Sequence, residues 1–381
     1  MSKKLNIMVS AGECSGDLRA AECIQLWTVL GDVSFFGMGG PAMRLAGCDI
    51  HIPIDEHSSF GFFEVVIDLP RLYVKLFKLK SLLKTHQPDC LVCVDFQAFN
   101  LKLARAAKSM GIPVLFYVGP QIWASRPHRA KKYANVVDHL AVLFPFEPTL
   151  YKRLPVKVSY VGHPLVSAIQ KIPHMTAARS FFQFKNNATY LGLFPGSRAS
   201  EIKRLLPVML DAVNLLQNHT NNLYIVLSLA EHFPDDYFRP YLADFPNIKV
   251  IKGQSQMLMQ ACDVLLISSG TATLEAGLLN KPMVVTYRLN ALSEWLAKKL
   301  LLTPYVALPN VLLNRCVVPE LIGKKCYPLA LKNALMPLLT SEKTRQDMVQ
   351  ELSQLNMILG QESKPASMVN VLKEVLNQNR D

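Results

Sequence analysis

The sequence predicts an α/β protein of two domains, each built around a parallel β-sheet with helices on both faces. The chain has 381 residues, which is too long for one ordinary core and sufficient for two. Apolar segments of strand length alternate with amphipathic segments of helix length, as is typical of parallel sheets. The alternation is interrupted at about residues 167–187, where Pro173 and a polar Lys185-Asn-Asn187 run occur. We therefore expect a linker there.

The expected strands fall into two groups on either side of this linker. Residues 1–166 contain candidate strands at 5–9, 33–37, 90–95, 114–118, 139–144 and 158–161. Residues 188–326 contain candidates at 190–194, 223–229, 248–251, 264–267 and 283–287. Open parallel sheets bind ligands at the carboxyl ends of their strands, so two such Rossmann-like domains would face each other across a cleft. Residues 327–381 show only helical patterns, and we expect this tail to cross back over the domains.

Composition narrows the class of partner. The net charge of +12 favours an anionic ligand or membrane surface, and no Lys/Arg tract with interleaved aromatic residues indicates nucleic acid binding. The eight cysteines are scattered, and Cys90 and Cys93 would point to opposite faces of a strand, so we expect no metal site. The first residues show no secretory signal, which predicts a cytoplasmic protein.

One glycine-rich segment resembles a nicotinamide cofactor motif. Residues 37–42, Gly-Met-Gly-Gly-Pro-Ala, fit the pattern G-x-G-x-x-A. However, Pro41 to Ala46 allows little more than one helical turn before Gly47, whereas the cofactor motif requires a full crossover helix. We expect a tight turn here and no cofactor.

The stretch Phe194-Pro-Gly-Ser-Arg198 follows a predicted strand and precedes a predicted helix. Free backbone N–H groups at a helix start, together with the helix dipole, form an anion site, and Gly196 and Ser197 permit close approach. Arg198 adds a forked donor suited to phosphate oxygens. Alternatively, Arg198 pairs with a surface acid.

A second motif, Ser268-Ser-Gly-Thr-Ala-Thr-Leu-Glu275, also joins a predicted strand to a predicted helix. Ser269, Gly270 and Thr271 predict a second phosphate site at the helix start. Glu275, about one turn further on, can accept hydrogen bonds from the two hydroxyls of a ribose. The alternative is an ordinary Ser/Thr N-cap, but two such motifs together favour a nucleotide diphosphate.

The N-terminal half has its own strand-end loops. Glu13, Ser15 and Asp17 follow the first strand, and Asp95 ends the third, so these side chains are expected to converge. A carboxylate at this edge could take a proton from an attacking hydroxyl. Each of these residues could instead cap a helix, Asp17 most plausibly.

An amphipathic basic stretch, about residues 58–84, predicts contact with an anionic membrane. Phe60, Phe62 and Phe63 precede a helix whose Leu72 and Leu76 begin an apolar face that continues through residues 79 and 83. The alternative is a helix that packs this face against the core and exposes its lysines.

Taken together, the motifs resemble those of the lipid-A-disaccharide synthases, in the same order along nearly the whole chain. They are Ala11-Gly-Glu-Cys-Ser-Gly-Asp17, Gly37-Met-Gly-Gly-Pro41, Pro120-Gln-Ile-Trp-Ala124, Pro145-Phe-Glu147, Val161-Gly-His-Pro164, Pro195-Gly-Ser-Arg198, Ser269-Gly-Thr-Ala272 with Leu274-Glu275, and Tyr305-Val-Ala-Leu-Pro-Asn310.

The resemblance implies a metal-independent, inverting glycosyltransferase of the GT-B arrangement, bound peripherally to the inner face of the cytoplasmic membrane. It implies that UDP-2,3-diacylglucosamine and 2,3-diacylglucosamine 1-phosphate are joined by a β-1,6 link, with UDP released. By position, Asp95 matches the base or charge-organising acid, Arg198 the diphosphate contact, Glu275 the ribose contact and Asn310 a donor-side group. Residues 13, 15 and 17 match the acceptor-side loop.

Two departures from the family pattern lie near Asp95. Gln97 and Ala98 stand where the family has proline and a second aspartate, and Gly119-Pro-Gln-Ile-Trp-Ala-Ser-Arg126 replaces S-P-S-x-W-A-W-R. Three other functions remain open. They are a peptidoglycan N-acetylglucosaminyltransferase, a UDP-N-acetylglucosamine epimerase and a nucleotide-binding membrane-surface protein without turnover. The number of subunits is also open, a homodimer included.

Overall fold

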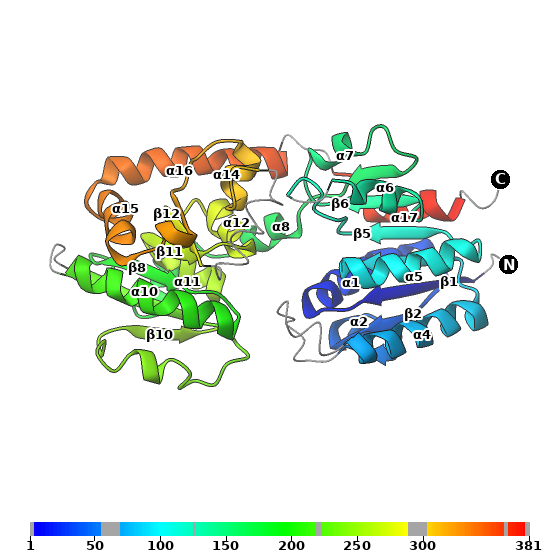
Figure 1. The fold of residues 1–381 in the computed structure, drawn as a ribbon, viewed down its shortest axis with the longest axis horizontal. Coiled ribbons are helices and arrows are strands. Elements are labelled where there is room, and N and C mark those ends of the chain that lie inside the picture. The colour runs from blue at the N-terminus through cyan, green and yellow to red at the C-terminus, as the bar shows by residue number, and fades with distance from the viewer. Residues whose placement is uncertain are drawn as a thin grey trace. The chain divides into compact units, whose positions relative to one another are not determined.

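The structure, a computed structural model, describes residues 4–54, 69–124, 127–217, 222–288, 303–361 and 365–377. The chain divides into two compact units (Figure 1). One unit is Met1–Pro164 with Ser363–Asp381, and the other is Leu165–Glu362. Phe60, Phe62 and Phe63 lie outside the described residues.

The first unit contains a seven-stranded parallel sheet in the order β3-β2-β1-β4-β5-β6-β7. The strands are β1 (Leu5–Ala11), β2 (Val33–Gly39), β3 (Cys48–Pro53), β4 (Cys90–Val94), β5 (Val114–Tyr117), β6 (His139–Val142) and β7 (Lys157–Tyr160). The helices are α1 (Cys14–Trp27), α2 (Pro41–Leu45), α4 (Leu69–His86), α5 (Gln97–Ser109), α6 (Arg129–Ala134), α7 (Glu147–Leu150) and α17 (Met368–Asn377), with a 3-10 turn at Thr28–Leu30.

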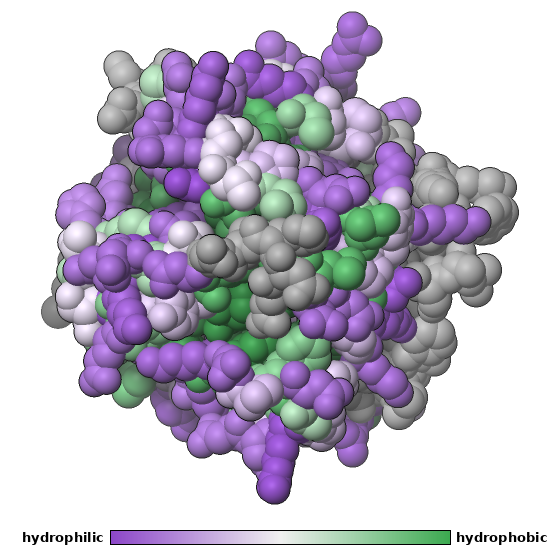
Figure 2. Space-filling model, turned by 90° about the vertical axis from the view of Figure 1, so that its left-hand side faces the viewer, coloured by the Kyte–Doolittle hydropathy of each residue, from purple (hydrophilic) through white to green (hydrophobic). Residues whose placement is uncertain are grey.

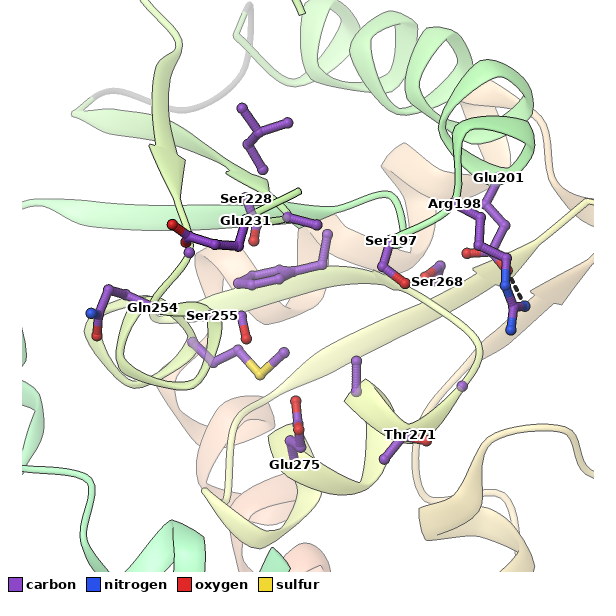
Figure 3. A pocket seen from close by; sticks show the side chains of 18 of the residues that line it. Ser197, Arg198, Glu201, Ser228, Glu231, Gln254, Ser255, Ser268, Thr271 and Glu275 are labelled. Atoms are coloured by element: carbon purple, nitrogen blue, oxygen red, sulfur yellow. Dashed lines mark hydrogen bonds and ion pairs between the residues drawn. The ribbon is translucent and has the colours of Figure 1, made fainter. Parts of the chain in front are cut away.

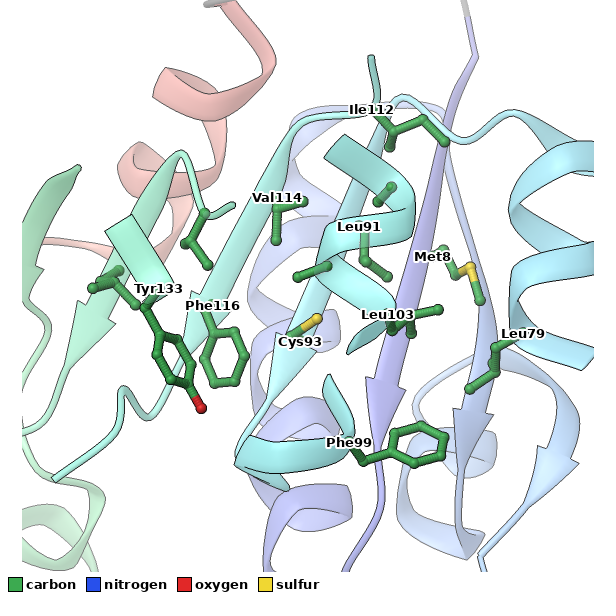
Figure 4. Close-up of a cluster of buried hydrophobic side chains, with 14 of the residues drawn as sticks. Met8, Leu79, Leu91, Cys93, Phe99, Leu103, Ile112, Val114, Phe116 and Tyr133 are labelled. Carbon is green, nitrogen blue, oxygen red and sulfur yellow. The ribbon is translucent and has the colours of Figure 1, made fainter. Parts of the chain in front are cut away.

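The core of this unit lies between the sheet and the helices α4 and α5 (Figure 4). Leu79 from α4 and Leu103 from α5 are fully buried and pack with Met8, Leu91 and Phe116 from three strands. Strands covered on both faces need apolar side chains on both, which explains the nearly continuous hydrophobic runs in the sequence. Cys93 belongs to this core, and Cys90 is also buried in β4 but is not one of the core's residues.

The end of the chain belongs to the first unit. Helix α17, red in Figure 1, packs against α1 and β6, although these elements are far away in sequence. The Trp27 indole Nε1 donates to the Met368 carbonyl over 3.0 Å, and the Ala366 amide donates to the Tyr160 carbonyl over 2.7 Å.

The second unit contains a six-stranded parallel sheet in the order β10-β9-β8-β11-β12-β13. The strands are β8 (Thr189–Phe194), β9 (Leu223–Leu229), β10 (Lys249–Lys252), β11 (Val264–Ser268), β12 (Met283–Tyr287) and β13 (Glu320–Ile322). The helices are α8 (Pro164–Gln170), α9 (Met175–Phe181), α10 (Ala199–Gln217), α11 (Ser255–Ala261), α12 (Thr271–Leu278), α14 (Leu308–Leu313), α15 (Pro328–Thr340) and α16 (Glu342–Asn356), with 3-10 turns at Arg239–Tyr241 and Gly323–Lys325 and a π-helical turn at Met357–Gln361.

Both sheets have the strand order of a Rossmann-like domain, so the predicted fold class is confirmed. Strands β3 and β13 were not expected. Residues 37–42 form the end of β2 and the start of the one-turn helix α2, as the short spacing before Gly47 predicts.

The segment expected as a linker is built into the second unit. Arg179 on α9 is buried; its Nη2 lies 2.6 Å from Asp263 Oδ2, and its Nε donates to the Ala261 carbonyl over 3.0 Å. A buried arginine requires such partners, and they bind α9 to the loop before β11. In the tail, α15 and α16 pack on the second unit, and α17 crosses back to the first.

Polar side chains dominate the face shown in Figure 2, at the second-unit end of Figure 1, with smaller groups of apolar side chains between them. In the part of the chain that the structure describes, no helix has the length and hydrophobicity needed to cross a membrane.

Candidate active site

A cavity of about 600 Å³ lies at the carboxyl edge of the second sheet (Figure 3). Its floor is where the strand order reverses, between β8 and β11, which is where open α/β sheets bind ligands. The β8–α10 loop contributes Gly196, Ser197 and Arg198, and the β11–α12 loop with the start of α12 contributes Ser269, Gly270, Thr271 and Glu275. The structure therefore brings these seven predicted residues to one cavity.

The two loops present helix starts to this cavity. Gly196 has φ +111°, and a Cβ there would lie 2.4 Å from Glu201 Oε2. Gly270, the residue before α12, has φ +155°. At both positions a side chain would be strained, so glycine permits the turn that exposes the helix N–H groups. Two helix N-termini beside one cavity make it suitable for an anion.

The charged side chains of the cavity are partly paired. Arg198 Nη1 lies 3.2 Å from Glu201 Oε1, and half of the Arg198 side chain is exposed. Glu275 accepts a hydrogen bond from Gln256 Nε2 over 3.1 Å. Burial raises the pKa of the Glu275 carboxyl, and the Gln256 bond acts against that rise. Glu275 points into the cavity beside Thr271 in Figure 3.

The opposite wall consists of residues that the sequence analysis missed. They are Ser228, Glu231, Gly253, Gln254 and Ser255, from the end of β9 and the β10–α11 loop. Gly253 and Gln254 both have positive φ, and a Cβ on Gly253 would meet Glu231 Oε2 at 2.2 Å. The sequence contains a signal for residues 253–255, a Gly-Gln-Ser stretch one residue after the predicted strand at 248–251.

Asn310 does not line this cavity. Its side chain is fully buried, and its Nδ2 donates over 2.8 Å both to the Val318 carbonyl and to Glu320 Oε1. Its Oδ1 accepts from the amides of Val317 and Val318. Asn310 therefore fixes the loop between α14 and β13, and the expectation of a donor contact is corrected.

A second cavity, of about 380 Å³, lies in the first unit, also where the strand order reverses, between β1 and β4. Its lining includes Glu13 and Asp95, the side chains Leu72 and Leu76 of α4, and Lys102 of α5. One side of this cavity is therefore acidic and another apolar.

Asp95 occupies a strained turn. Asp95 has φ +50° and Phe96 has φ +45°, a conformation that costs free energy for residues other than glycine. Asn100 Nδ2 supports the turn by donating to the Asp95 carbonyl over 2.9 Å. Gly12 makes room for it, since a Cβ there would lie 2.2 Å from the Phe96 ring. Strain of this kind is concentrated at functional sites.

The Asp95 carboxylate is mostly buried, and its Oδ2 lies 3.4 Å from Arg19 Nη1 on α1. Burial raises the pKa of Asp95, while the Arg19 charge and the Phe96 backbone N–H lower it. Arg19 was not predicted, because nothing in the sequence relates it to a residue 76 positions away.

Two predicted residues of the first loop do not join Asp95. The Asp17 carboxylate is buried and accepts hydrogen bonds from the amides of Gly40, Ala42 and Met43 at 2.7, 2.9 and 3.1 Å. It caps α2, the structural alternative, so we withdraw the catalytic assignment of Asp17. Ser15 is exposed on the first turn of α1 and is not one of the cavity's lining residues.

The leucine face of α4 meets the core. Leu76, Leu79 and Leu83 are buried, because the sheet provides the apolar surface that such a face requires. Leu76 is therefore turned to the core and away from a membrane surface, while Leu72 is partly buried. Both line the Asp95 cavity, and their contact with an acyl chain remains a prediction. Other side chains of α4 are exposed: Tyr73, Val74 and Phe77, the last 76% exposed.

Among the described residues, no cluster of three or more His, Cys, Asp or Glu side chains has the arrangement of a metal site.

Comparison with known proteins gives consistent matches. The family model described as lipid-A-disaccharide synthetase matches residues 7–372. The lipid-A-disaccharide synthase of Chromobacterium violaceum is 38% identical over 364 residues, covering 94% of each chain. That of Nitrosococcus oceani is 37% identical, covering 93% of this chain and 92% of its own. That of Trichlorobacter lovleyi is 36% identical, covering 98% of each.

Solved structures share the fold at low sequence identity. A UDP-GlcNAc 2-epimerase from Neisseria meningitidis, bound to UDP-GlcNAc, superposes with a TM-score of 0.63 at 13% identity, covering 98% of this chain and all of that one. A glycotransferase of kitacinnamycin gives a TM-score of 0.63 at 14% identity and covers 99% of both chains.

Proposed function

Since the chain belongs to the lipid-A-disaccharide synthase family, we propose that its two cavities divide the substrates of that reaction between them. The enzyme is a glycosyltransferase of lipid A biosynthesis. It joins UDP-2,3-diacylglucosamine to 2,3-diacylglucosamine 1-phosphate and releases UDP. The comparisons establish the reaction, and the roles of individual residues below are our proposal.

We assign the UDP part of the donor to the cavity of the second unit. Arg198 and the N-termini of α10 and α12 hold the diphosphate, since both helix starts and a forked cation face one space. Glu275 accepts hydrogen bonds from the ribose hydroxyls. We assign the base of the nucleotide to the opposite wall of the cavity, where Gly253, Gln254 and Ser255 lie. The polar lining suits a nucleotide better than an acyl chain.

The acceptor belongs, in this proposal, to the Asp95 cavity. Asp95 takes the proton of the acceptor's primary hydroxyl, the oxygen forms a bond to the anomeric carbon, and the bond from that carbon to the diphosphate breaks. UDP leaves with the electron pair, which Arg198 and the helix N-termini stabilise. Attack opposite the leaving group inverts the configuration. Leu72 and Leu76 provide the apolar side of the cavity that an acyl chain requires.

We further propose that α4 meets the inner face of the cytoplasmic membrane, from which acylated substrates come. Phe77 and Val74 are exposed on α4, and Lys78 and Lys84, two exposed basic residues of this helix, would accompany them to an anionic surface. This is a surface different from the leucine face that the sequence suggested.

The observation on which the donor assignment rests is the convergence of Arg198, both glycine loops and Glu275 on one cavity. We would test the proposal by incubating the purified chain with donor and acylated acceptor and measuring UDP. Release that requires the acceptor supports it. Release from donor alone, or nucleotide binding with no release, would refute it.

Two matched variants sharpen this test. Arg198→Ala should weaken UDP binding roughly tenfold to a hundredfold, the loss expected for one charge-assisted contact. Arg204→Ala removes an exposed arginine of α10, the helix that follows Arg198, and should leave UDP binding unchanged.

A further inference from the structure

Arg19 is the charged neighbour of Asp95 in the first unit. Its Nη1 lies 3.4 Å from Asp95 Oδ2, and the two side chains are 20% and 27% exposed. A pair this far from solvent is screened less than a surface pair, so the interaction affects the protonation of the carboxyl group.

The backbone around Arg19 and the backbone around Asp95 are each held in place by hydrogen bonds. Arg19 lies in α1 two residues after Asp17, whose three bonds to the start of α2 fix that turn of α1. Asp95 lies in the turn that Asn100 supports, and its amide donates to the Tyr117 carbonyl over 2.9 Å. The backbone positions of the two residues are therefore set by the fold, and the observed contact of 3.4 Å joins their side chains.

The other titratable groups around this pair do not replace Arg19. Glu13 and Lys102 line the same cavity as Asp95, and Tyr133 and Tyr117 approach the pair from α6 and β5. His163 faces Arg19, and burial together with the Arg19 charge lowers the pKa of His163 to about 4, so it is neutral at physiological pH. Of the influences that lower the pKa of Asp95, the Arg19 charge is the largest.

We propose that Arg19 is a positioning residue that keeps the Asp95 carboxylate ionised and oriented for proton transfer. This proposal rests on the assignment of Asp95 as the base. Burial alone would favour the protonated acid, which cannot accept the hydroxyl proton. Arg19 counteracts burial without contacting the reacting atoms. It acts through Asp95.

The test is the pH dependence of kcat/KM for UDP release, with the same donor and acceptor for every variant. Arg19→Leu should move the acidic limb upward by about one pH unit, since the loss of an opposite charge at this distance raises a carboxyl pKa by that order. Arg19→Lys should restore most of the shift. The acceptor phosphate titrates in the same range but contributes equally to every profile, so it cancels in the difference.

Arg44→Leu is the matched control, because it removes an exposed arginine of α2 with the same change in net charge. Its profile should coincide with that of the unchanged chain. Arg19→Gln serves as a second variant if Arg19→Leu does not fold. Urea unfolding followed by the fluorescence of Trp27, which is buried in the first unit, verifies that this unit is folded in each variant.

An unshifted acidic limb in Arg19→Leu or Arg19→Gln would overturn the proposal, whether kcat/KM falls equally at all pH values or the acceptor KM alone rises. The first result indicates a structural role and the second a substrate contact. Asp95→Asn distinguishes failure of the base assignment from failure of the Arg19 proposal. Near-normal turnover in Asp95→Asn would refute the assignment of the base. An inactive Asp95→Asn together with an unshifted pH profile in Arg19→Leu would refute only the role of Arg19.

Discussion

Arg198 Nη1 lies 3.2 Å from Oε1 of Glu201 in the first turn of α10, so the cation that we assign to the diphosphate is paired with a carboxylate of the helix that directly follows it. A diphosphate must compete with that carboxylate for the guanidinium. It must also approach the negative charge of Glu201.

Glu201→Gln should therefore tighten UDP binding, by roughly threefold to tenfold, since a modest ion pair and a like-charge repulsion are both removed. Isothermal titration of UDP measures this. Asp211→Asn makes the same charge change at an exposed position of α10 and should have no effect. Weaker binding in Glu201→Gln would mean that Glu201 orients Arg198 for the ligand.

Asp17→Ala should destabilise the first unit, because three backbone N–H groups at the start of α2 lose a charged acceptor. Replacing a side chain that caps a helix N-terminus by alanine costs about 0.5–2 kcal/mol, so a loss of roughly 2 kcal/mol, the upper end of that range, is expected for this buried carboxylate. Urea unfolding followed by tryptophan fluorescence measures it, since Trp27 is buried in this unit. An unchanged midpoint with lost turnover would restore the catalytic assignment.

How far the sequence predicts this protein depends on how local each signal is. The central strands of both sheets are buried on both faces and are therefore apolar runs in the sequence. This pattern predicts them correctly. Strand β3 carries Asp49 and His51 at the edge of its sheet, and β13 has three residues, so neither shows that pattern.

The same reasoning applies to the candidate sites. The two glycine loops, at residues 196–198 and 269–271, are local strand–turn–helix patterns, so the sequence identifies their residues, and the structure places them around one cavity. Asp17, Asn310 and Arg19 depend on contacts with other segments: Asp17 caps a helix 23 residues later, and Arg19 meets Asp95 across 76 residues. A single sequence contains no signal for such contacts. The tight placement of α9 likewise depends on the Arg179–Asp263 pair.

Phe77→Ser should weaken binding to vesicles of phosphatidylethanolamine and phosphatidylglycerol by roughly fivefold. The loss of one large apolar contact should reduce the binding free energy by about 1 kcal/mol, which corresponds to that factor. Cosedimentation measures the bound fraction. Phe181→Ser removes a similarly exposed phenylalanine from α9 in the second unit and is the control. Equal losses in the two variants would contradict the assignment of α4 to the membrane.

His139 makes the junction of β6 and α17 sensitive to acid. Its ring is fully buried, with Nε2 2.9 Å from Ser159 Oγ and Nδ1 3.7 Å from Glu374 Oε2. Burial lowers the pKa of His139 from 6.5 to about 4. Between these two values the unfolded chain binds more protons than the folded one, so this group's contribution to stability is complete above about pH 6.5 and is lost as the pH falls toward 4.

His139→Gln should therefore flatten the fall in melting temperature between pH 6.5 and pH 4 relative to the unchanged chain. Only the difference between the two curves is diagnostic, because burial raises the pKa of Glu147 to about 7 and its contribution has the opposite sign. Differential scanning calorimetry at matched ionic strength provides the curves. Parallel curves would show that His139 titrates normally in the folded protein.

The most direct measurement of the donor assignment is a crystal structure of the chain with UDP. We expect one nucleotide in the cavity of the second unit, with its diphosphate within hydrogen-bond distance of Arg198 and the Ser269–Thr271 backbone, and its ribose hydroxyls on Glu275. UDP bound anywhere else, or bound there with its phosphates away from Arg198, would contradict the account.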